Sequence, residues 1–166
     1  MRARTAAALA VLTLLTGSAC TAGASHPRPP ADDVIKAATR ALTDDCLTRR
    51  GLTPKSDRQR VSDALFGTGR AELSLRLPTG YVVRTHTDGC LADAQRRLYG
   101  DQDRWFRTSV VVNNLKPEAA GTGRPLSEVR AAHRPEIAEW RRLRARALAQ
   151  ATALLEGGTT HPKGNQ

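Results

Sequence analysis

The chain has 166 residues and a formal net charge of +10, a length that supports one domain with a modest core and argues against several domains. An N-terminal signal and spacer would leave roughly 130 residues for folding. Only four lysines accompany 22 arginines, a skew typical of GC-rich genomes. Part of the basic charge therefore reflects codon usage, and only the remainder would reflect a role in binding polyanions.

The segment 1–19 is predicted to be an export signal. Arg2 and Arg4 give a positive start, Ala6–Leu15 form an apolar run, and small residues lead up to Cys20, which is the order that a secretory signal requires. The apolar run is about half as long as the roughly 20 residues that span a bilayer. We therefore expect export rather than a permanent transmembrane helix.

The sequence offers two alternative sites at which the signal would be cleaved. The segment Gly17–Cys20 resembles a bacterial lipobox, with glycine where an aliphatic residue is usual. Cleavage there would leave Cys20 to carry a diacylglycerol, whose two chains would anchor the protein to the cytoplasmic membrane on its outer face. Ala22–Ala24 has an A-x-A pattern that would instead release a soluble protein starting at Ser25.

The expected organisation has four parts. They are a signal peptide over 1–19, a lipidated cysteine with a flexible, proline-containing spacer over 20–31, a mainly helical globular domain over 32–156, and a disordered tail over 157–166.

Cys46 and Cys90 are the two cysteines outside the signal region. An exported protein reaches a compartment that permits disulfides, so the pair predicts one bridge. Two free buried thiols are the alternative. A metal site is not expected, because no histidine or further cysteine lies at ligand spacing from either one.

Apolar spacing predicts the elements of the first half of the domain. A helix is expected after Asp32 and Asp33, which we interpret as its N-terminal caps; its buried stripe consists of Val34, Ala38, Leu42 and Cys46. Ala71–Leu77 alternates apolar and polar residues and is separated by a Pro-Thr-Gly turn from the β-rich Tyr81–Thr85. This pattern predicts a β-hairpin.

The second half is predicted to be helical. Helices are expected after Gly89, over Asp101–Leu115, within Pro125–Arg134 and from Pro135 onward, with a loop at Gly121 and Gly123. The last helix carries a core-facing stripe of Trp140, Leu143, Ala147, Ala151 and Leu154. The fold class is therefore mainly α with one small β-hairpin (α+β), in a small single domain.

Two motifs carry possible chemistry. His86 and Asp88 lie near Cys90 and are the only candidate residues for a small secreted hydrolase. The tetrapeptide Gly-Thr-Gly-Arg occurs at Gly67–Arg70 and at Gly121–Arg124, where it predicts turns or, alternatively, anion-binding nests. No nucleophile elbow, phosphate loop or zinc pair accompanies them, so we expect no enzyme activity and no cofactor.

Three arginines of the last helix are candidates for contact with an anionic surface. Arg141, Arg142 and Arg146 lie off its apolar stripe, and each cation near an anionic membrane contributes about 1 kcal/mol to binding. A simple solvated face is the alternative. Candidate partners are thus the membrane itself, an anionic lipid or a wall polymer, without specific nucleic-acid binding.

A longer stretch resembles a known group of proteins. Asp88–Asp101, with Arg104–Arg107, Val111–Leu115 and the upstream Cys46–Gly51, is similar to uncharacterised exported proteins and lipoproteins of actinobacteria such as Streptomyces. The resemblance covers roughly residues 42–116. It implies export, a cysteine pair and a small helical domain, and it implies no substrate.

These features together predict a non-enzymatic envelope lipoprotein. It would act as a binding or interaction module at the outer face of the cytoplasmic membrane. A basic binder of polyanions or membrane surfaces is the first alternative, and a small secreted hydrolase is the second.

Overall fold

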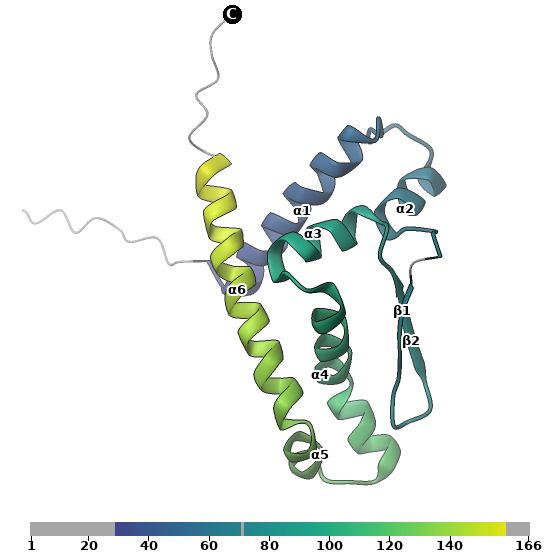
Figure 1. Cartoon of the computed structure of the whole chain (residues 1–166), viewed down its shortest axis with the longest axis vertical. Coiled ribbons are helices and arrows are strands. Elements are labelled where there is room, and N and C mark those ends of the chain that lie inside the picture. The colour runs from purple at the N-terminus through teal and green to yellow at the C-terminus, as the bar shows by residue number, and fades with distance from the viewer. Residues whose placement is uncertain (1–28, 71, 159–166) are drawn as a thin grey trace, which may run out of the picture.

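Six helices and one β-hairpin make up the described part of the chain, residues 29–70 and 72–158 of the computed structural model. In order they are α1 (Ala31–Arg49), α2 (Arg58–Phe66), β1 (Glu72–Arg76), β2 (Val82–His86), α3 (Cys90–Tyr99), α4 (Gln102–Thr122), α5 (Leu126–Ala132) and α6 (Arg134–Gly158). The longest helix, α6, runs along the long axis of the molecule, with α1, α3 and α4 packed against it (Figure 1). The expected mainly helical domain with one hairpin is confirmed.

The main core lies where α1 and α3 meet α6. Its buried members are Ile35, Ala38, Leu98, Tyr99, Leu143, Ala147 and Ala151. The predicted stripes of the first and last helices face each other here, since Ala38, Ala147 and Ala151 are all fully buried. The ring of Tyr99 also stacks on Trp105, with centroids 3.6 Å apart.

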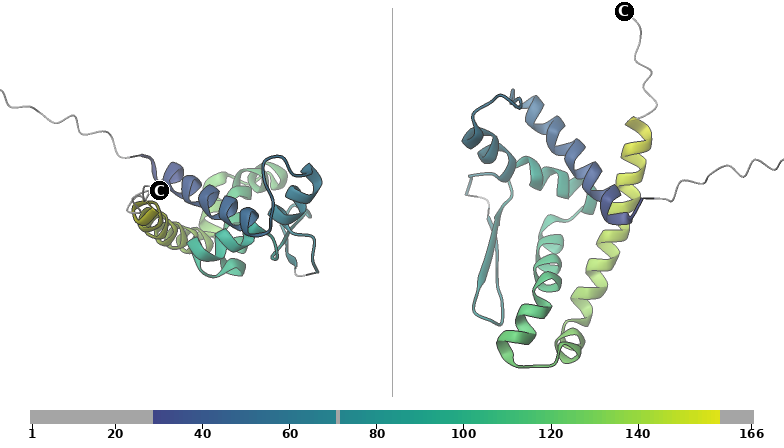
Figure 2. Two further views of the ribbon diagram at one scale, coloured as in Figure 1. Left: turned by 90° about the horizontal axis from the view of Figure 1, so that it is seen from above. Right: turned by 180° about the vertical axis from the view of Figure 1, so that it is seen from behind.

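The hairpin packs on α4, away from α6. β1 and β2 are antiparallel, with Leu75 opposite Val83, and the alternating leucines of β1 turn one apolar face toward Phe106 and Val110. The views from the front and from behind both place α4 between the hairpin and α6 (Figures 1 and 2). A two-stranded hairpin is marginal alone, so this contact stabilises it.

A disulfide joins Cys46 on α1 to Cys90 at the start of α3, with Cα atoms 5.7 Å apart. Both cysteines are buried, as the position of Cys46 on the apolar stripe of α1 requires. The predicted bridge is confirmed, and it holds α3 against α1 beside the main core.

Three helix boundaries differ from the sequence-based expectation. α6 continues through Gly157 to Gly158, so the expected tail cannot begin at residue 157. α1 begins at Ala31 after Pro30 and has no side-chain cap, so Asp32 and Asp33 lie inside its first turn. There they interact favourably with the helix dipole instead of capping it. α4 continues through Gly121 to Thr122, and only Gly123, with φ of +68°, ends it; tertiary contacts outweigh the low helix propensity of Gly121.

Removing the disulfide should lower the free energy of unfolding by about 4 kcal/mol, because the bridge restricts a loop of about 45 residues in the unfolded chain. The change is Cys46→Ala with Cys90→Ala, in residues 20–166 with Cys20→Ser, measured by urea unfolding. Reducing agent should destabilise the parent chain and leave this variant unchanged. Equal urea midpoints for the protein with and without the two alanine substitutions would contradict the expectation.

Candidate functional site

A cleft of about 570 Å³ opens between α4, α5 and α6. Nine residues from the three helices line it: Val112, Asn113, Leu115, Lys116, Leu126, Arg130, Ile137, Trp140 and Arg141. Three are cationic, five are apolar, one is an amide, and none is acidic. Two other clefts of similar size differ in this respect, because Asp44 lines both of them beside basic residues.

The three cations of the cleft have no acidic partner within the described residues. Lys116, Arg130 and Arg141 come from three different helices, and no carboxylate lies within salt-bridge distance of them in the described part of the chain. Their positive charge is therefore not neutralised by the fold. A concave surface lined by charge of one sign concentrates its field and attracts ions of the opposite sign.

Two other arginines of α6, Arg142 and Arg144, are neutralised. Glu139 pairs with Arg142 from its own helix and with Arg104 of α4 at 2.7 Å. Arg144 pairs with Asp32 of α1, and its guanidinium carbon lies 4.8 Å from the centroid of the Trp140 ring. Unpaired cations such as Arg60 and Arg97 also occur elsewhere in the described residues, so what distinguishes this cleft is that three of them line one concavity without an acid.

A buried histidine–carboxylate pair positions α5 at the edge of the cleft. Glu118 on α4 is only 4% exposed, and its Oε2 is hydrogen-bonded to Nε2 of His133, 2.9 Å away at the junction of α5 and α6. Nδ1 of His133 lies 3.9 Å from Glu136. Together with the fully buried Val129, this pair fixes α5 and hence the position of Arg130.

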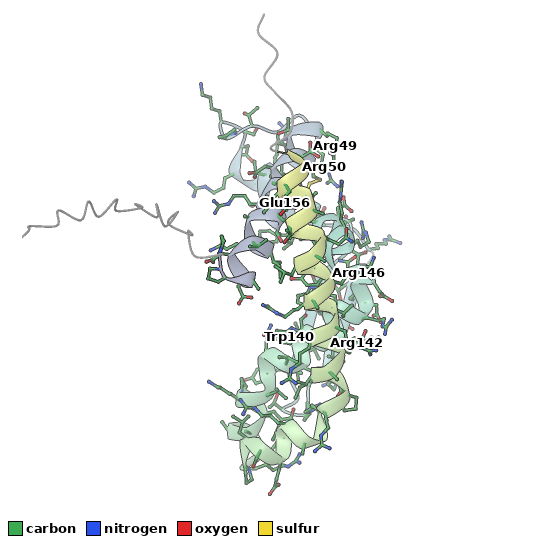
Figure 3. The ribbon with its side chains drawn as sticks, turned by 90° about the vertical axis from the view of Figure 1, so that its left-hand side faces the viewer. Arg49, Arg50, Trp140, Arg142, Arg146 and Glu156 are labelled. Atoms are coloured by element: carbon green, nitrogen blue, oxygen red, sulfur yellow. A yellow bond between two sulfur atoms is a disulfide. The ribbon has the colours of Figure 1, made fainter. Side chains whose placement is uncertain are left out.

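Only one of the three predicted arginines lines the cleft. Arg141 lines the cleft, whereas Arg142 pairs with Glu139. Arg146 lies one turn beyond Arg142 along α6 (Figure 3), with its guanidinium next to Gly100 at the end of α3. That position suits a cation, because the carboxyl end of a helix carries a partial negative charge.

Sequence reasoning missed Lys116 and Arg130 and assigned Trp140 to the core alone. Lys116 and Arg130 lie on two helices that the chain brings together only through tertiary packing. The sequence pattern that could have identified Lys116 and Arg130 is weak, because each is a single cation beside apolar residues of its own helix.

The first Gly-Thr-Gly-Arg segment surrounds an internal carboxylate. Oδ2 of Asp88 accepts a hydrogen bond from the Gly69 amide at 2.8 Å, and a Cβ atom at Gly67 or Gly69 would overlap the same carboxylate. Gly67 has φ of +84°, which glycine adopts without strain. The loop thus has the form of an anion nest, and Asp88 occupies it.

The charge state of Asp88 follows from these contacts. Desolvation alone would raise the pKa of Asp88, but hydrogen bonds from backbone amides, Gly69 first among them, and the charge of His86 lower it below its ordinary value. Asp88 and His86 share no hydrogen bond among the described contacts, and Nδ1 of His86 is buried without a partner. These two residues therefore form no acid–base pair joined by a hydrogen bond.

The second Gly-Thr-Gly-Arg segment forms a turn. Gly123 adopts a left-handed conformation that ends α4, and Arg124 lies 3.8 Å from Glu128 of α5. The segment connects two walls of the cleft without lining it.

Cys20 and the alternative cleavage site lie outside the described residues. Across 29–70 and 72–158, no helix is long and apolar enough to cross a membrane. The same residues contain no group of three or more histidine, cysteine or acidic side chains suited to a metal ion.

His133→Ala should destabilise the fold by about 1–3 kcal/mol, because it leaves the buried Glu118 carboxylate without its partner. Thermal unfolding of the two single variants and of the double variant Glu118→Ala/His133→Ala measures the coupling. The double variant should lose less stability than the two single variants added together. If the losses of the two single variants added exactly to the loss of the double variant, the Glu118–His133 contact would not hold α4 against the junction of α5 and α6.

Gly89→Ala tests the junction that carries Asp88. A Cβ atom at Gly89 would lie 2.5 Å from the Leu65 carbonyl oxygen, so backbone must move, and we expect a loss of about 1–3 kcal/mol in urea unfolding. Gly157→Ala is the matched control: it meets no atom within 4 Å and should be neutral or slightly stabilising. Equal effects of both changes would contradict the close approach.

Comparison with known proteins leaves the cleft to be interpreted from its own geometry. No family model, no curated protein and no solved structure matches the chain. The resemblance to exported actinobacterial proteins therefore remains a prediction from residues 42–116.

Proposed function

We propose that this protein is a non-enzymatic binding module that recognises an anionic ligand in the cleft between α4, α5 and α6. The observation that supports this most directly is the set of three cations without acidic partners, Lys116, Arg130 and Arg141, around a cleft that no acid lines. Hydrogen bonds to charged groups contribute about 1.5–3 kcal/mol each. Two or three such contacts would contribute about 3–9 kcal/mol to the binding of an anion.

The proposal places the module outside the cytoplasmic membrane, anchored by a diacylglycerol on Cys20. The signal-like order of the segment 1–19 supports export. Cys20 and Pro29 are nine positions apart, a stretch that extends to about 30 Å at most. An anchored domain therefore stays close to the membrane, and one released after Ala24 would bind the same class of ligand in solution.

A non-catalytic role fits how the fold uses its reactive side chains. Cys90 is bridged, Asp88 is held by loop amides, and His133 is paired with Glu118. Each of these groups already has a structural role, whereas the cleft cations have none among the described contacts. Binding is thus the chemistry that the free side chains support.

Trp140 provides a direct test of binding. In residues 20–166 with Cys20→Ser and Trp105→Phe, Trp140 is the one tryptophan, so its fluorescence reports on the cleft. Soluble inorganic polyphosphate should change this signal, and binding should weaken as salt is raised. Arg130→Gln with Arg141→Gln should reduce the affinity on the order of 10- to 30-fold.

The matched control removes the same charge elsewhere. Arg60 and Arg97 are exposed on α2 and α3, and their replacement by Gln should change the affinity less than threefold. Equal losses for the two double variants would show that net charge, and not the cleft, attracts the anion. Absence of any salt-sensitive binding would overturn the proposed function.

A further inference from the structure

We infer that the cleft binds the phosphate ester of an anionic phospholipid headgroup, with the adjoining apolar part of the lipid against Trp140 and Ile137. This inference rests on the proposed function and names its ligand. It concerns the membrane lipid itself rather than a soluble or wall-bound polyanion.

The mixed lining of the cleft favours an amphiphile. Five of its nine residues are apolar, among them Leu115, which is 7% exposed, and Trp140, which is partly buried. A polymer that carries only charge would leave these side chains without a matching surface. A lipid headgroup has a charged end and an apolar end within a few ångströms, and the cleft offers both kinds of contact.

The arrangement of the cations favours a phosphate over a carboxylate. Lys116, Arg130 and Arg141 each belong to a different helix around the cleft. A carboxylate presents two oxygens in one plane, whereas the oxygens of a phosphate ester point in several directions. Arginine also matches phosphate geometry with paired hydrogen bonds, and lysine binds phosphate as a point charge.

The spacer is long enough for the cleft to reach the membrane that would hold the anchor. Pro29 and Ala31 lie beside Leu148 and Thr152 of α6. Arg141 precedes Thr152 on the same helix by about three turns, a separation of about 16 Å along the helix axis. The spacer reaches about 30 Å. A chain anchored at Cys20 can therefore place its cleft on the same bilayer.

The experiment measures binding to vesicles and to a soluble phosphate ester. Residues 20–166 with Cys20→Ser and Trp105→Phe are titrated with vesicles of phosphatidylcholine alone, with vesicles of phosphatidylcholine and phosphatidylglycerol mixed two to one, and with glycerol 3-phosphate. We expect binding only to the anionic vesicles, with a shift of Trp140 emission to shorter wavelength as its ring enters an apolar environment. Glycerol 3-phosphate at millimolar concentration should compete without causing this shift.

Two double variants test whether vesicle binding takes place at the cleft. Arg130→Gln/Arg141→Gln should weaken vesicle binding at least tenfold, while Arg60→Gln/Arg97→Gln should change it less than threefold. Retention of the buried disulfide and an unchanged circular-dichroism spectrum serve to verify that each variant is folded. Equal losses for the two variants would overturn the inference, because binding would then follow net charge.

Two further outcomes separate this inference from the proposed function. Binding of polyphosphate at the cleft without binding of anionic vesicles would reject the lipid headgroup and leave an anion-binding module. Failure of both ligands to bind would reject both. Vesicle binding without a shift of Trp140 emission would also reject the inference, because the apolar part of the lipid would then not lie against that ring.

Discussion

Ala38 on α1 and Ala147 and Ala151 on α6 are completely buried and belong to one cluster. Small side chains allow helix backbones to approach closely, and the larger Ile35, Leu98 and Leu143 fill the space around them. This contact fixes the direction in which α1 crosses α6. Because α3 is tied to α1 by the disulfide and leads directly into α4, the orientation of every later helix depends on it.

The same contact determines where the cleft can form. The main core occupies α6 from Leu143 to Ala151, which leaves the preceding part of the helix to pack against α4 and α5. Ile137, Trp140 and Arg141 belong to that part. All nine lining residues lie on helices, so the position of the charged groups depends on packed elements rather than on loops. Such a site loses less conformational entropy when a ligand binds.

The periodic features of the fold were predictable because local sequence determines them. The stripes of α1 and α6, the alternation in β1 and the cysteine pair each follow from residue spacing, and the structure has them where they were expected. Helix ends were less predictable. Asp32 has the residue type of a cap, yet Pro30 occupies the N-cap position without a side-chain hydrogen bond, because the fixed φ of proline also suits a helix start.

The candidate site was only partly predictable. Arg141 could be selected from its position off the apolar stripe, but Lys116 and Arg130 reach the same cleft only through the packing of α4 and α5 on α6. Asp88 shows the opposite case. Its neighbourhood of histidine, cysteine and glycine suggested chemistry, and the carboxylate instead accepts an amide hydrogen bond within the fold. One-dimensional spacing carries no information on either arrangement.

The high arginine content has two explanations that the contacts can separate. Codon usage would place arginines wherever a polar helix face tolerates them, and some of them then pair with a carboxylate one turn away, as Arg49 does with Asp45 and Arg107 with Asp103. Such exposed pairs contribute little to stability, and they also cancel charge. Other arginines, such as Arg60 and Arg97, have no carboxylate partner among the described residues, whereas Lys116, Arg130 and Arg141 combine that lack with a shared cleft that five apolar residues line. An anionic ligand in the cleft would therefore be attracted by charge of one sign.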